Sequence, residues 1–172
     1  AGTLLYQGKT IESRKYYTLA IESLGNSVWK NDERALAMLY HNLGTAFFLE
    51  KNISQAQEFY EKAYKIRKKS SKEDTLEIAS SLFALSMIQK EKKQSQLAVT
   101  LALQALRIRE KLLKETPTAE LAENYNFLAN LYYQLDSHDV SFEYDIKYVE
   151  CCEKMYGKYE QSLDLLYRNL AE

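Results

Sequence analysis

The stretch YHNLGT at residues 40–45 recurs three times at nearly constant spacing, and this recurrence decides the fold class. LFALSM occupies residues 82–87, YNFLAN residues 125–130 and YRNLAE residues 167–172, so the steps are 42, 43 and 42 residues. A period of about 20–50 residues is typical of solenoids, whose units bury their apolar faces only by stacking on one another. The repeat therefore predicts a binding scaffold before it predicts any chemistry.

Composition and charge exclude several classes of protein. The chain of 172 residues has a net charge of −1, which gives no attraction to nucleic acid or to acidic lipid. No apolar run approaches the roughly 18–20 residues of a membrane span, and there is no secretory signal. The two cysteines are adjacent, at Cys151 and Cys152, which excludes a disulfide scaffold. We therefore expect a cytoplasmic protein. Because the chain lacks an initiator Met and ends within the fourth copy of the block, we also expect it to be a segment of a larger protein, with Ala1-Gly2 a remnant of cloning.

Each repeat consists of two amphipathic helical patterns separated by a short break. Apolar residues recur at i, i+3, i+4 and i+7 in residues 35–50, and a second pattern of this kind follows in residues 56–66. The next copy has its patterns at residues 78–88 and 98–108, and a further first helix runs from about residue 121 to residue 135. The sequence therefore predicts antiparallel helix pairs.

Polar residues predict where some of these helices begin and end. Ser54 with Gln57 three residues later forms a capping box for a second helix. Thr116 followed by Pro117 predicts an N-cap with proline at the first helical position. The run Arg67-Lys68-Lys69 suits a helix C-terminus, because cations there interact favourably with the helix dipole.

The first full copy resembles a tetratricopeptide repeat, with Tyr40-x-x-Leu43-Gly44-x-x-Phe47 followed by Ala56-x-x-x-Tyr60-x-x-Ala63. The resemblance implies an all-α, right-handed superhelical solenoid of antiparallel helix pairs. It also implies that the small residues Gly44, Ser86 and Ala129 let the two helices of a pair cross closely. The long period and the endings Ile66-Arg67 and Ile108-Arg109 are similar to the repeats of kinesin light chains. The array then comprises a partial repeat (1–31), two repeats (32–74 and 75–116), a degenerate repeat (117–157), and a partial repeat or capping helix (158–172).

Two places depart from the family pattern. Gln89 replaces the aromatic residue that is expected in the second full copy. In the last full copy Ser141, Asp145 and Tyr148 stand where Ala, an aromatic residue and Ala are expected. The packing of residues 138–156 is therefore the least defined by the sequence.

The resemblance implies that the first helix of each pair lines the inner face of a curved stack. Carried over position by position, the family pattern places twelve residues there as candidate peptide-binding residues: Met38, His41, Thr45, Phe48, Ser80, Phe83, Met87, Lys90, Glu123, Asn126, Asn130 and Tyr133. Several are large and apolar yet lie off the predicted core stripe, as in peptide-binding grooves. Phe48, Phe83 and Tyr133 are the predicted apolar anchors, and Asn126 with Asn130 would bind a peptide backbone. The alternative is that some of these residues pack against the adjacent repeat.

Other patterns have ordinary structural explanations. His41 and His138 are isolated from other ligand residues, so we expect no metal and no cofactor. Cys151-Cys152 is read as two small buried residues rather than a redox pair, and residues 65–72 (KIRKKSSK) as a solvated helix end rather than a phosphorylation site or a basic contact patch. No catalytic nucleophile, phosphate loop or cofactor motif is present, so we expect no enzymatic activity.

One well-known type of groove, the clamp that holds the terminal carboxylate of a chaperone tail, is incomplete here. Asn42 fits one of its positions, but Ala84 and Phe127 occupy the equivalents in the next two repeats. A role as a chaperone co-factor is therefore not favoured.

Together these observations predict a scaffold or adaptor that binds a protein or peptide partner in the inner groove, with no nucleic-acid or membrane contact. The alternative is the ligand-sensing domain of a peptide-responsive bacterial transcriptional regulator, and a third hypothesis is a structural spacer. An upstream helix-turn-helix would favour the regulator, and an upstream coiled coil would favour a motor adaptor. We also expect weak self-association through apolar residues near both ends, Leu4-Leu5 and Leu163, Leu166 and Leu170.

Overall fold

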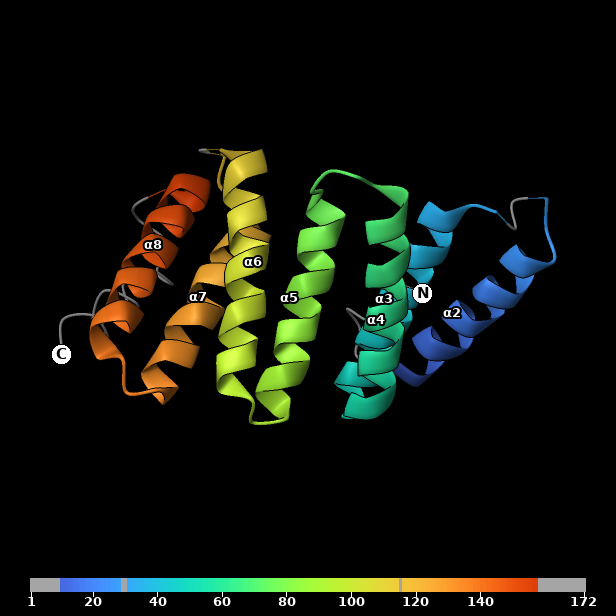
Figure 1. Ribbon diagram of the computed structural model, residues 1–172, viewed down its shortest axis with the longest axis horizontal. Helices are drawn as coiled ribbons and strands as arrows, with labels where there is room; N and C mark the ends of the chain where they lie inside the picture. Colours follow the sequence, from blue (N-terminus) through green and yellow to red (C-terminus); the bar gives the residue numbers. More distant parts are fainter. Residues whose placement is uncertain (1–9, 29–30, 115, 158–172) are drawn as a thin grey trace.

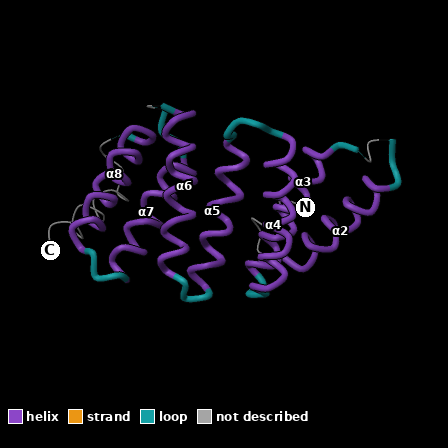
Figure 2. The backbone as a smooth tube through the Cα atoms, in the orientation of Figure 1, coloured by secondary structure: helices purple, strands orange, loops and turns teal. Residues whose placement is uncertain are grey.

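The computed structural model describes residues 10–28, 31–114 and 116–157. This part of the chain folds into seven consecutive α-helices and contains no strand. The helices are α2 (Thr10–Gly25), α3 (Glu33–Leu49), α4 (Ile53–Ser70), α5 (Leu76–Glu91), α6 (Ser95–Leu113), α7 (Ala119–Gln134) and α8 (His138–Tyr156). Each helix packs mainly against its neighbours in the chain, and most closely within the pairs α3–α4, α5–α6 and α7–α8. Figures 1 and 2 show the resulting row of helices. The all-α solenoid expected from the repeat is thus confirmed.

Hydrogen-bonding side chains begin four of these helices. Asp32, Asn52, Thr75 and Thr118 each accept a hydrogen bond from the backbone N–H three residues later, which satisfies one of the unpaired donors of the first turn. The basic run at residues 67–69 lies in the last turn of α4, as predicted.

Both predicted N-caps are wrong by a short distance along the chain. Helix α4 is capped by Asn52, whose side chain accepts from the N–H of Gln55 at 3.3 Å, and Ser54 is already inside the helix. Helix α7 is capped by Thr118, so Pro117 precedes the helix instead of opening it. In each case the cap is the polar residue directly before the first helical residue, because only from there can its side chain reach the free N–H groups of the first turn.

The turn inside each helix pair has the same unusual backbone. Lys51, Lys93 and Asp136 have φ values of 61°, 60° and 56°, although none of them is glycine. At the first of these turns the N–H of Asn52 donates to the carbonyl of Phe47 at 2.9 Å, and the other two turns repeat this bond. This is a Schellman motif, in which a left-handed residue ends the helix. The chain therefore reverses within three residues, which keeps the paired helices antiparallel and adjacent.

The close crossing of α3 and α4 depends on Gly44, as the sequence predicted. A Cβ atom added to Gly44 would lie 2.8 Å from Cδ1 of Tyr60, whose ring is buried in α4. The equivalent first-helix residues, Ser86 and Ala129, are also buried. Ser86 can be larger than glycine because Ala102 stands in α6 where Tyr60 stands in α4. The volume across each crossing is therefore balanced between the two helices.

The degenerate repeat at residues 138–156 forms a regular helix, α8. Ser141 replaces the expected alanine without leaving an unpaired group, because its buried hydroxyl donates to the carbonyl of Ala129 at 2.9 Å. Tyr144 stacks on Tyr132 with ring centroids 5.6 Å apart. Cys151 and Cys152 are both buried and free of disulfide bonds. The departures from the family pattern are therefore accommodated locally.

Candidate peptide-binding surface

The twelve residues expected on the inner face differ widely in burial. Met38 and Tyr133 are 52% and 66% exposed, and Glu123, Asn126 and Asn130 also reach solvent. Phe83 is only 5% exposed. The remaining six are half-buried: His41, Thr45, Phe48, Ser80, Met87 and Lys90. The accessible part of this surface therefore consists mainly of residues from α3 and α7.

Phe83 is a core residue, so the expectation that it lies off the buried stripe is wrong. Its ring meets the edge of Phe127 at a centroid distance of 5.1 Å, and the guanidinium carbon of Arg109 lies 4.8 Å above its centre. The cause is the position of α5 in the middle of the row, where ten of its sixteen residues are buried. Phe83 therefore stabilises the junction with the next repeat and cannot receive a ligand side chain.

Half-buried Phe48 and Lys90 each belong to a cation–aromatic contact. The ammonium of Lys51 lies 5.9 Å from the ring centre of Phe48, and the ammonium of Lys90 lies 5.2 Å from that of Phe127. Such contacts stabilise by about 0.5–1 kcal/mol at exposed sites. The two lysines therefore partly shield the aromatic rings while keeping a charge at the surface.

His41 and Thr45 meet the ring of Tyr60 at the junction of α3 and α4. The Tyr60 hydroxyl lies 3.2 Å from Oγ1 of Thr45, and Thr45 donates to the carbonyl of His41. The imidazole of His41 lies 5.2 Å from the tyrosine ring, and its buried Nδ1 has no hydrogen-bond partner among the described residues. Burial, and to a smaller extent the charge of Arg67, lowers the pKa of His41 to about 4, while burial raises the pKa of Tyr60 to about 12. Both side chains are therefore neutral at physiological pH.

Asn126 and Asn130 stand one helical turn apart on α7 and bond to each other. The amide of Asn130 donates to the carbonyl of Asn126 at 2.7 Å and to its side-chain oxygen at 3.0 Å. These two bonds do not use the side-chain NH₂ of Asn126, so this group can still donate a hydrogen bond to a ligand.

Two arginines that the sequence analysis noted only as family-like helix ends connect successive repeats. Arg67 donates to Ser81 Oγ at 2.6 Å and to the carbonyl of Glu77 at 2.8 Å. Arg109, which is buried, donates to Asn124 Oδ1 at 2.8 Å. Each arginine therefore reaches from the second helix of one pair to the first helix of the next. The sequence shows that the two arginines are one repeat of 42 residues apart, but it does not show which residues they bond to.

Arg109 also affects a predicted groove residue. Burial raises the pKa of the Glu123 carboxyl, and the charge of Arg109 opposes this shift. Burial likewise lowers the pKa of Arg109 itself. Arg109 forms no ion pair within the described part of the chain, so its charge is stabilised by Asn124 Oδ1, by the face of Phe83 and by the more distant carboxylates of Glu123 and Glu120.

A cavity of about 600 Å³ lies where α3 and α5 begin and α4 ends. Met38 and Ile66 supply apolar wall, while Arg67, Ser70 and Glu77 supply polar groups. The ion pair between Arg34 and Glu77, with 3.3 Å between the charged atoms, belongs to the same region. Of the predicted inner-face residues only Met38 lines this cavity, and nothing in the sequence repeat indicated it.

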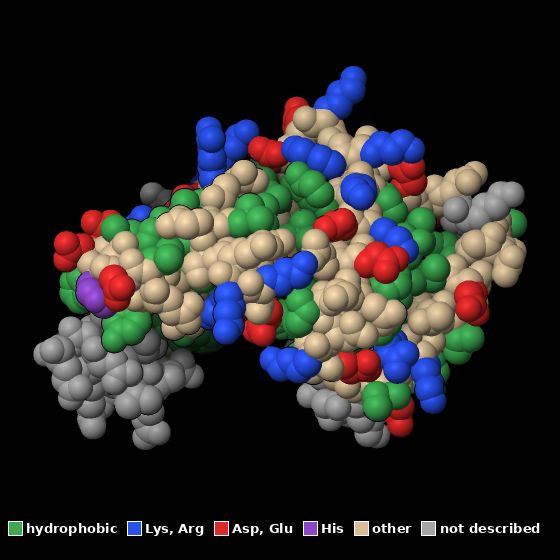
Figure 3. Space-filling model, turned by 60° about the horizontal axis from the view of Figure 1, so that its bottom comes forward, with side chains coloured by type: hydrophobic (Ala, Val, Ile, Leu, Met, Phe, Trp, Pro, Cys, Tyr) green, Lys and Arg blue, Asp and Glu red, His purple; other side chains and the backbone are tan. Residues whose placement is uncertain are grey.

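Several classes of site are absent from the described residues. Residues 10–28, 31–114 and 116–157 contain no cluster of three His, Cys, Asp or Glu side chains that could hold a metal ion. Within the same ranges no helix is both long and apolar enough to span a membrane. The surface in Figure 3 shows basic, acidic and hydrophobic side chains interspersed, without one large area of a single charge.

Comparison with known proteins identifies the family. The sequence profile described as tetratricopeptide repeat matches residues 1–69 and 35–111, so the chain belongs to the tetratricopeptide repeat family. Repeats of this family generally mediate protein–protein interactions, and proteins built from them are typically scaffolds without enzymatic activity. No curated protein matches the chain significantly.

Solved structures show the same long-repeat fold. The crystal structure of BtubC (BKLC) from P. vanneervenii superposes with a TM-score of 0.81 at 24% identity, over 97% of this chain and 66% of that chain. A putative kinesin light chain from Podosopora anserina with nearly identical TPR-like repeats gives a TM-score of 0.76 at 18% identity, over 98% of this chain and 79% of that one. The chain thus spans just under two thirds of the BtubC chain. The similarity to kinesin light chain repeats expected from the sequence is confirmed at the level of the fold.

Proposed function

We propose that the chain is a scaffold or adaptor whose inner face, formed by α3, α5 and α7, binds an extended or helical segment of a partner protein. The exposure of Met38 and Tyr133 carries this proposal. These large apolar side chains belong to the first and third pairs, at positions that the family pattern assigns to the inner face, and they are 52% and 66% accessible to solvent. Exposed apolar groups flanked by polar residues are typical of peptide-binding surfaces.

The burial of the neighbouring residues changes the expected anchors. Phe83 cannot be an anchor, because the next repeat covers it. The proposed anchors are therefore Met38, Phe48 and Tyr133. Tyr133 offers an aromatic face and a hydroxyl group, and Met38 offers a flexible thioether that adapts to different ligand side chains. Asn126 and Asn130, which precede Tyr133 on α7, would bind peptide backbone groups without requiring a particular sequence.

The proposal is tested with peptides selected against the wild-type protein from a random peptide display library. Their dissociation constants are then measured by fluorescence anisotropy with single alanine variants of Met38, Phe48 and Tyr133. Each variant should weaken binding by roughly 1–3 kcal/mol, the range for residues that anchor an interface. Phe83→Ala is unsuitable as a test, because removing a buried phenylalanine costs about 3–5 kcal/mol of stability.

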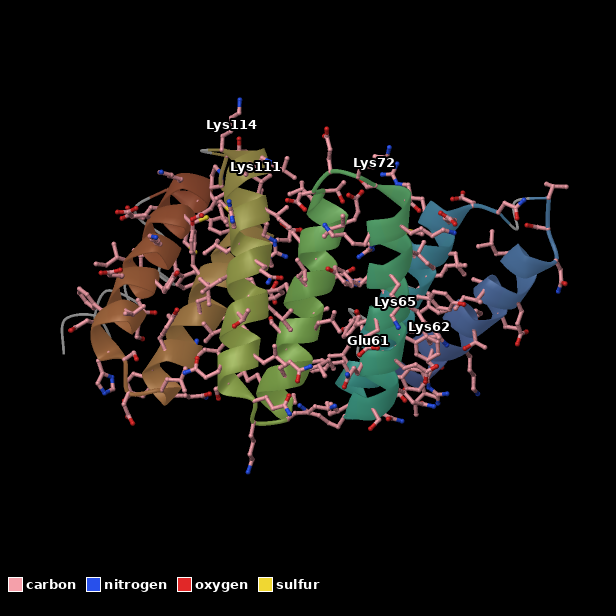
Figure 4. The ribbon with its side chains drawn as sticks, in the orientation of Figure 1. Glu61, Lys62, Lys65, Lys72, Lys111 and Lys114 are labelled. Carbon is pink, nitrogen blue, oxygen red and sulfur yellow. The ribbon has the colours of Figure 1, made fainter. Side chains whose placement is uncertain are left out.

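Lys62→Ala and Lys111→Ala are the matched controls. Figure 4 shows Lys62 on α4 and Lys111 near the end of α6, both on second helices, so neither lies on the proposed face. Their dissociation constants should equal that of the wild type. If the control variants lose binding while the Met38, Phe48 and Tyr133 variants keep it, the partner uses the outer face and the proposal is wrong.

A further inference from the structure

The cavity where α3 and α5 begin and α4 ends adjoins the proposed inner face, because Met38 belongs to both. Figure 1 shows this place at the upper edge of the row of helices. The volume of about 600 Å³ lies within the range of about 300–1,000 Å³ that is typical of ligand sites. The cavity is therefore large enough for a side chain of a bound segment.

Two carboxylates that line this cavity already have partners within the chain. Lys69 Nζ donates to Glu33 Oε1 at 3.2 Å, and Ser70 Oγ donates to Glu33 Oε2. The bonds from Ser70 and Lys69 lower the pKa of Glu33, so this carboxylate is ionised and its charge is met by Lys69. Asp32 caps α3 by accepting from the N–H of Ala35 at 2.9 Å. Neither carboxylate therefore depends on a cationic ligand for a partner.

The cations that line the cavity are paired as well. Arg34 forms an ion pair with Glu77, with 3.3 Å between the charged atoms. The half-buried guanidinium of Arg67 donates to Ser81 Oγ at 2.6 Å and to the carbonyl of Glu77 at 2.8 Å. An anionic ligand would compete with these contacts for the same two arginines.

The remaining polar residues of the lining, Ser71 and Thr75, bond to backbone groups of the link between α4 and α5 and of the first turn of α5. Every polar residue that lines the cavity thus has a partner within the chain. A charged ligand breaks one of these contacts or stays unpaired, and a buried polar or charged group without a partner costs free energy. The polar lining therefore disfavours a charged occupant.

The rest of the lining is apolar and is still available to a ligand. It consists of Ala35, Ala37, Met38 and Ile66. Met38 is 52% exposed, and it occupies a position where the next two first helices have the polar residues Ser80 and Glu123. Removing apolar surface from water contributes about 25 cal/mol per Å². An uncharged apolar group gains this contribution without breaking any of the polar contacts.

We propose that the cavity receives a large, uncharged, apolar side chain of the partner segment that binds the inner face. The inference rests on the proposed function, because the occupant belongs to the same bound segment. Met38 then contacts the segment both on the inner face and inside the cavity, while the ion pair of Arg34 with Glu77 stays intact. The cavity thus selects partner segments by an apolar residue instead of by charge.

The first test uses three small probes of similar shape, namely benzyl alcohol, benzoate and benzylamine, which are neutral, anionic and cationic at pH 7. They are titrated into wild-type protein labelled with carbon-13 at the methionine methyl groups, and Met38→Leu identifies the Met38 signal in the NMR spectrum. Benzyl alcohol should shift this signal with a dissociation constant about fivefold or more below those of the charged probes, because it breaks no polar contact. Met87 and Met155 lie outside the cavity lining, so their signals should not move.

Tighter binding of benzoate would show that an arginine of the lining attracts an anion, and tighter binding of benzylamine would show that a carboxylate attracts a cation. Either result overturns the proposal, and so does an unchanged Met38 signal with benzyl alcohol. This titration uses the wild-type protein and does not depend on how a variant folds.

The second test fills the cavity. Ala35→Leu enlarges a side chain of the cavity wall and should abolish the effect of benzyl alcohol on the Met38 signal. Ala119→Leu makes the same substitution at the exposed first residue of α7 and should leave the effect unchanged. The peptides selected against the wild type should bind the Ala35→Leu variant about tenfold or more weakly, as expected when an anchor side chain loses its pocket. They should bind the Ala119→Leu variant as they bind the wild type.

The peptide measurements separate this inference from the proposed function. If Ala35→Leu binds the peptides normally while the alanine variants of Phe48 and Tyr133 do not, the cavity inference is wrong and the proposed function stands. If benzyl alcohol shifts the Met38 signal but peptide binding is independent of Phe48 and Tyr133, the proposed inner face is wrong. The occupant of the cavity is then not a residue of a segment bound there, and the inference is overturned with it.

Discussion

Gly44 provides the most direct test of how the paired helices approach each other. The structure places the site of a Cβ atom on Gly44 at 2.8 Å from Cδ1 and 2.9 Å from Cε1 of Tyr60. Ordinary contacts between carbon atoms are about 3.5–4.0 Å, so Gly44→Ala requires one of the two helices to move. The Tyr60 ring cannot turn away freely, because it is buried and its hydroxyl is bonded to Thr45.

Two opposing effects set the size of the change. Overpacking of a buried site typically costs about 1–3 kcal/mol, and alanine gains about 1 kcal/mol over glycine from helix propensity. The net destabilisation for Gly44→Ala is therefore about 0–2 kcal/mol, or a fall in Tm of up to about 8 °C for a chain of this size. Gly44→Leu adds three more carbon atoms at the same crossing and should cost several kcal/mol.

Thermal unfolding followed by circular dichroism measures these differences, with Gly25→Ala as the matched control. Gly25 also lies in a helix, but nothing stands within 4 Å of its added Cβ atom, so this variant should be neutral or more stable. The pair Gly44→Ser with Tyr60→Ala reproduces Ser86 and Ala102 of the next repeat. In the Tyr60→Ala background the serine should therefore be less costly than in the wild type. A Gly44→Leu variant as stable as the wild type would refute this explanation of the helix crossing.

Three further predictions concern single residues. Arg109→Ala should lower the free energy of unfolding by about 1–3 kcal/mol, because it leaves the buried side-chain oxygen of Asn124 without its donor; the exposed Arg107→Ala should be neutral in the same urea titration. Lys51→Gly should raise the free energy of unfolding by about 1 kcal/mol, since a left-handed backbone costs a residue other than glycine about 1–2 kcal/mol; a lower urea midpoint would contradict this. His41 has a folded-state pKa of about 4, below the ordinary value of 6.5, so the unfolded chain binds the extra proton first and stability is lost as the pH falls from about 6.5 to 4, by on the order of 3 kcal/mol. His41→Gln should flatten this part of the stability profile, and an unchanged profile would show that His41 is not the group responsible.

The fold could be predicted because its determinants are local and periodic. Apolar residues at helical spacing, repeated every 42 or 43 residues, are sufficient to define helix pairs that must stack. Helix starts were less predictable, because Asn52 competes with Ser54, and Thr118 with Thr116, within a few residues. The left-handed turns had no sequence signal at all, since lysine and aspartate occupy positions where glycine is the usual indicator.

The candidate surface was predicted only in part, because exposure depends on the side chains that the paired helix and the next repeat contribute. His41, Phe83 and Asn126 occupy the same position of three successive first helices, yet they are half-buried, buried and exposed respectively. The difference comes from their neighbours: the ring of Tyr60 lies against His41, whereas Phe83 is enclosed by an aromatic ring from α7 and a guanidinium from α6. Asn126 accepts its side-chain hydrogen bond from Asn130 on its own helix and is exposed. A repeat pattern assigns the position of a residue on its helix, but the residues that cover it come from the paired helix and from the next repeat, each with its own substitutions. In a degenerate array the binding surface is therefore a property of successive pairs of repeats, and only the structure shows which pairs leave it open.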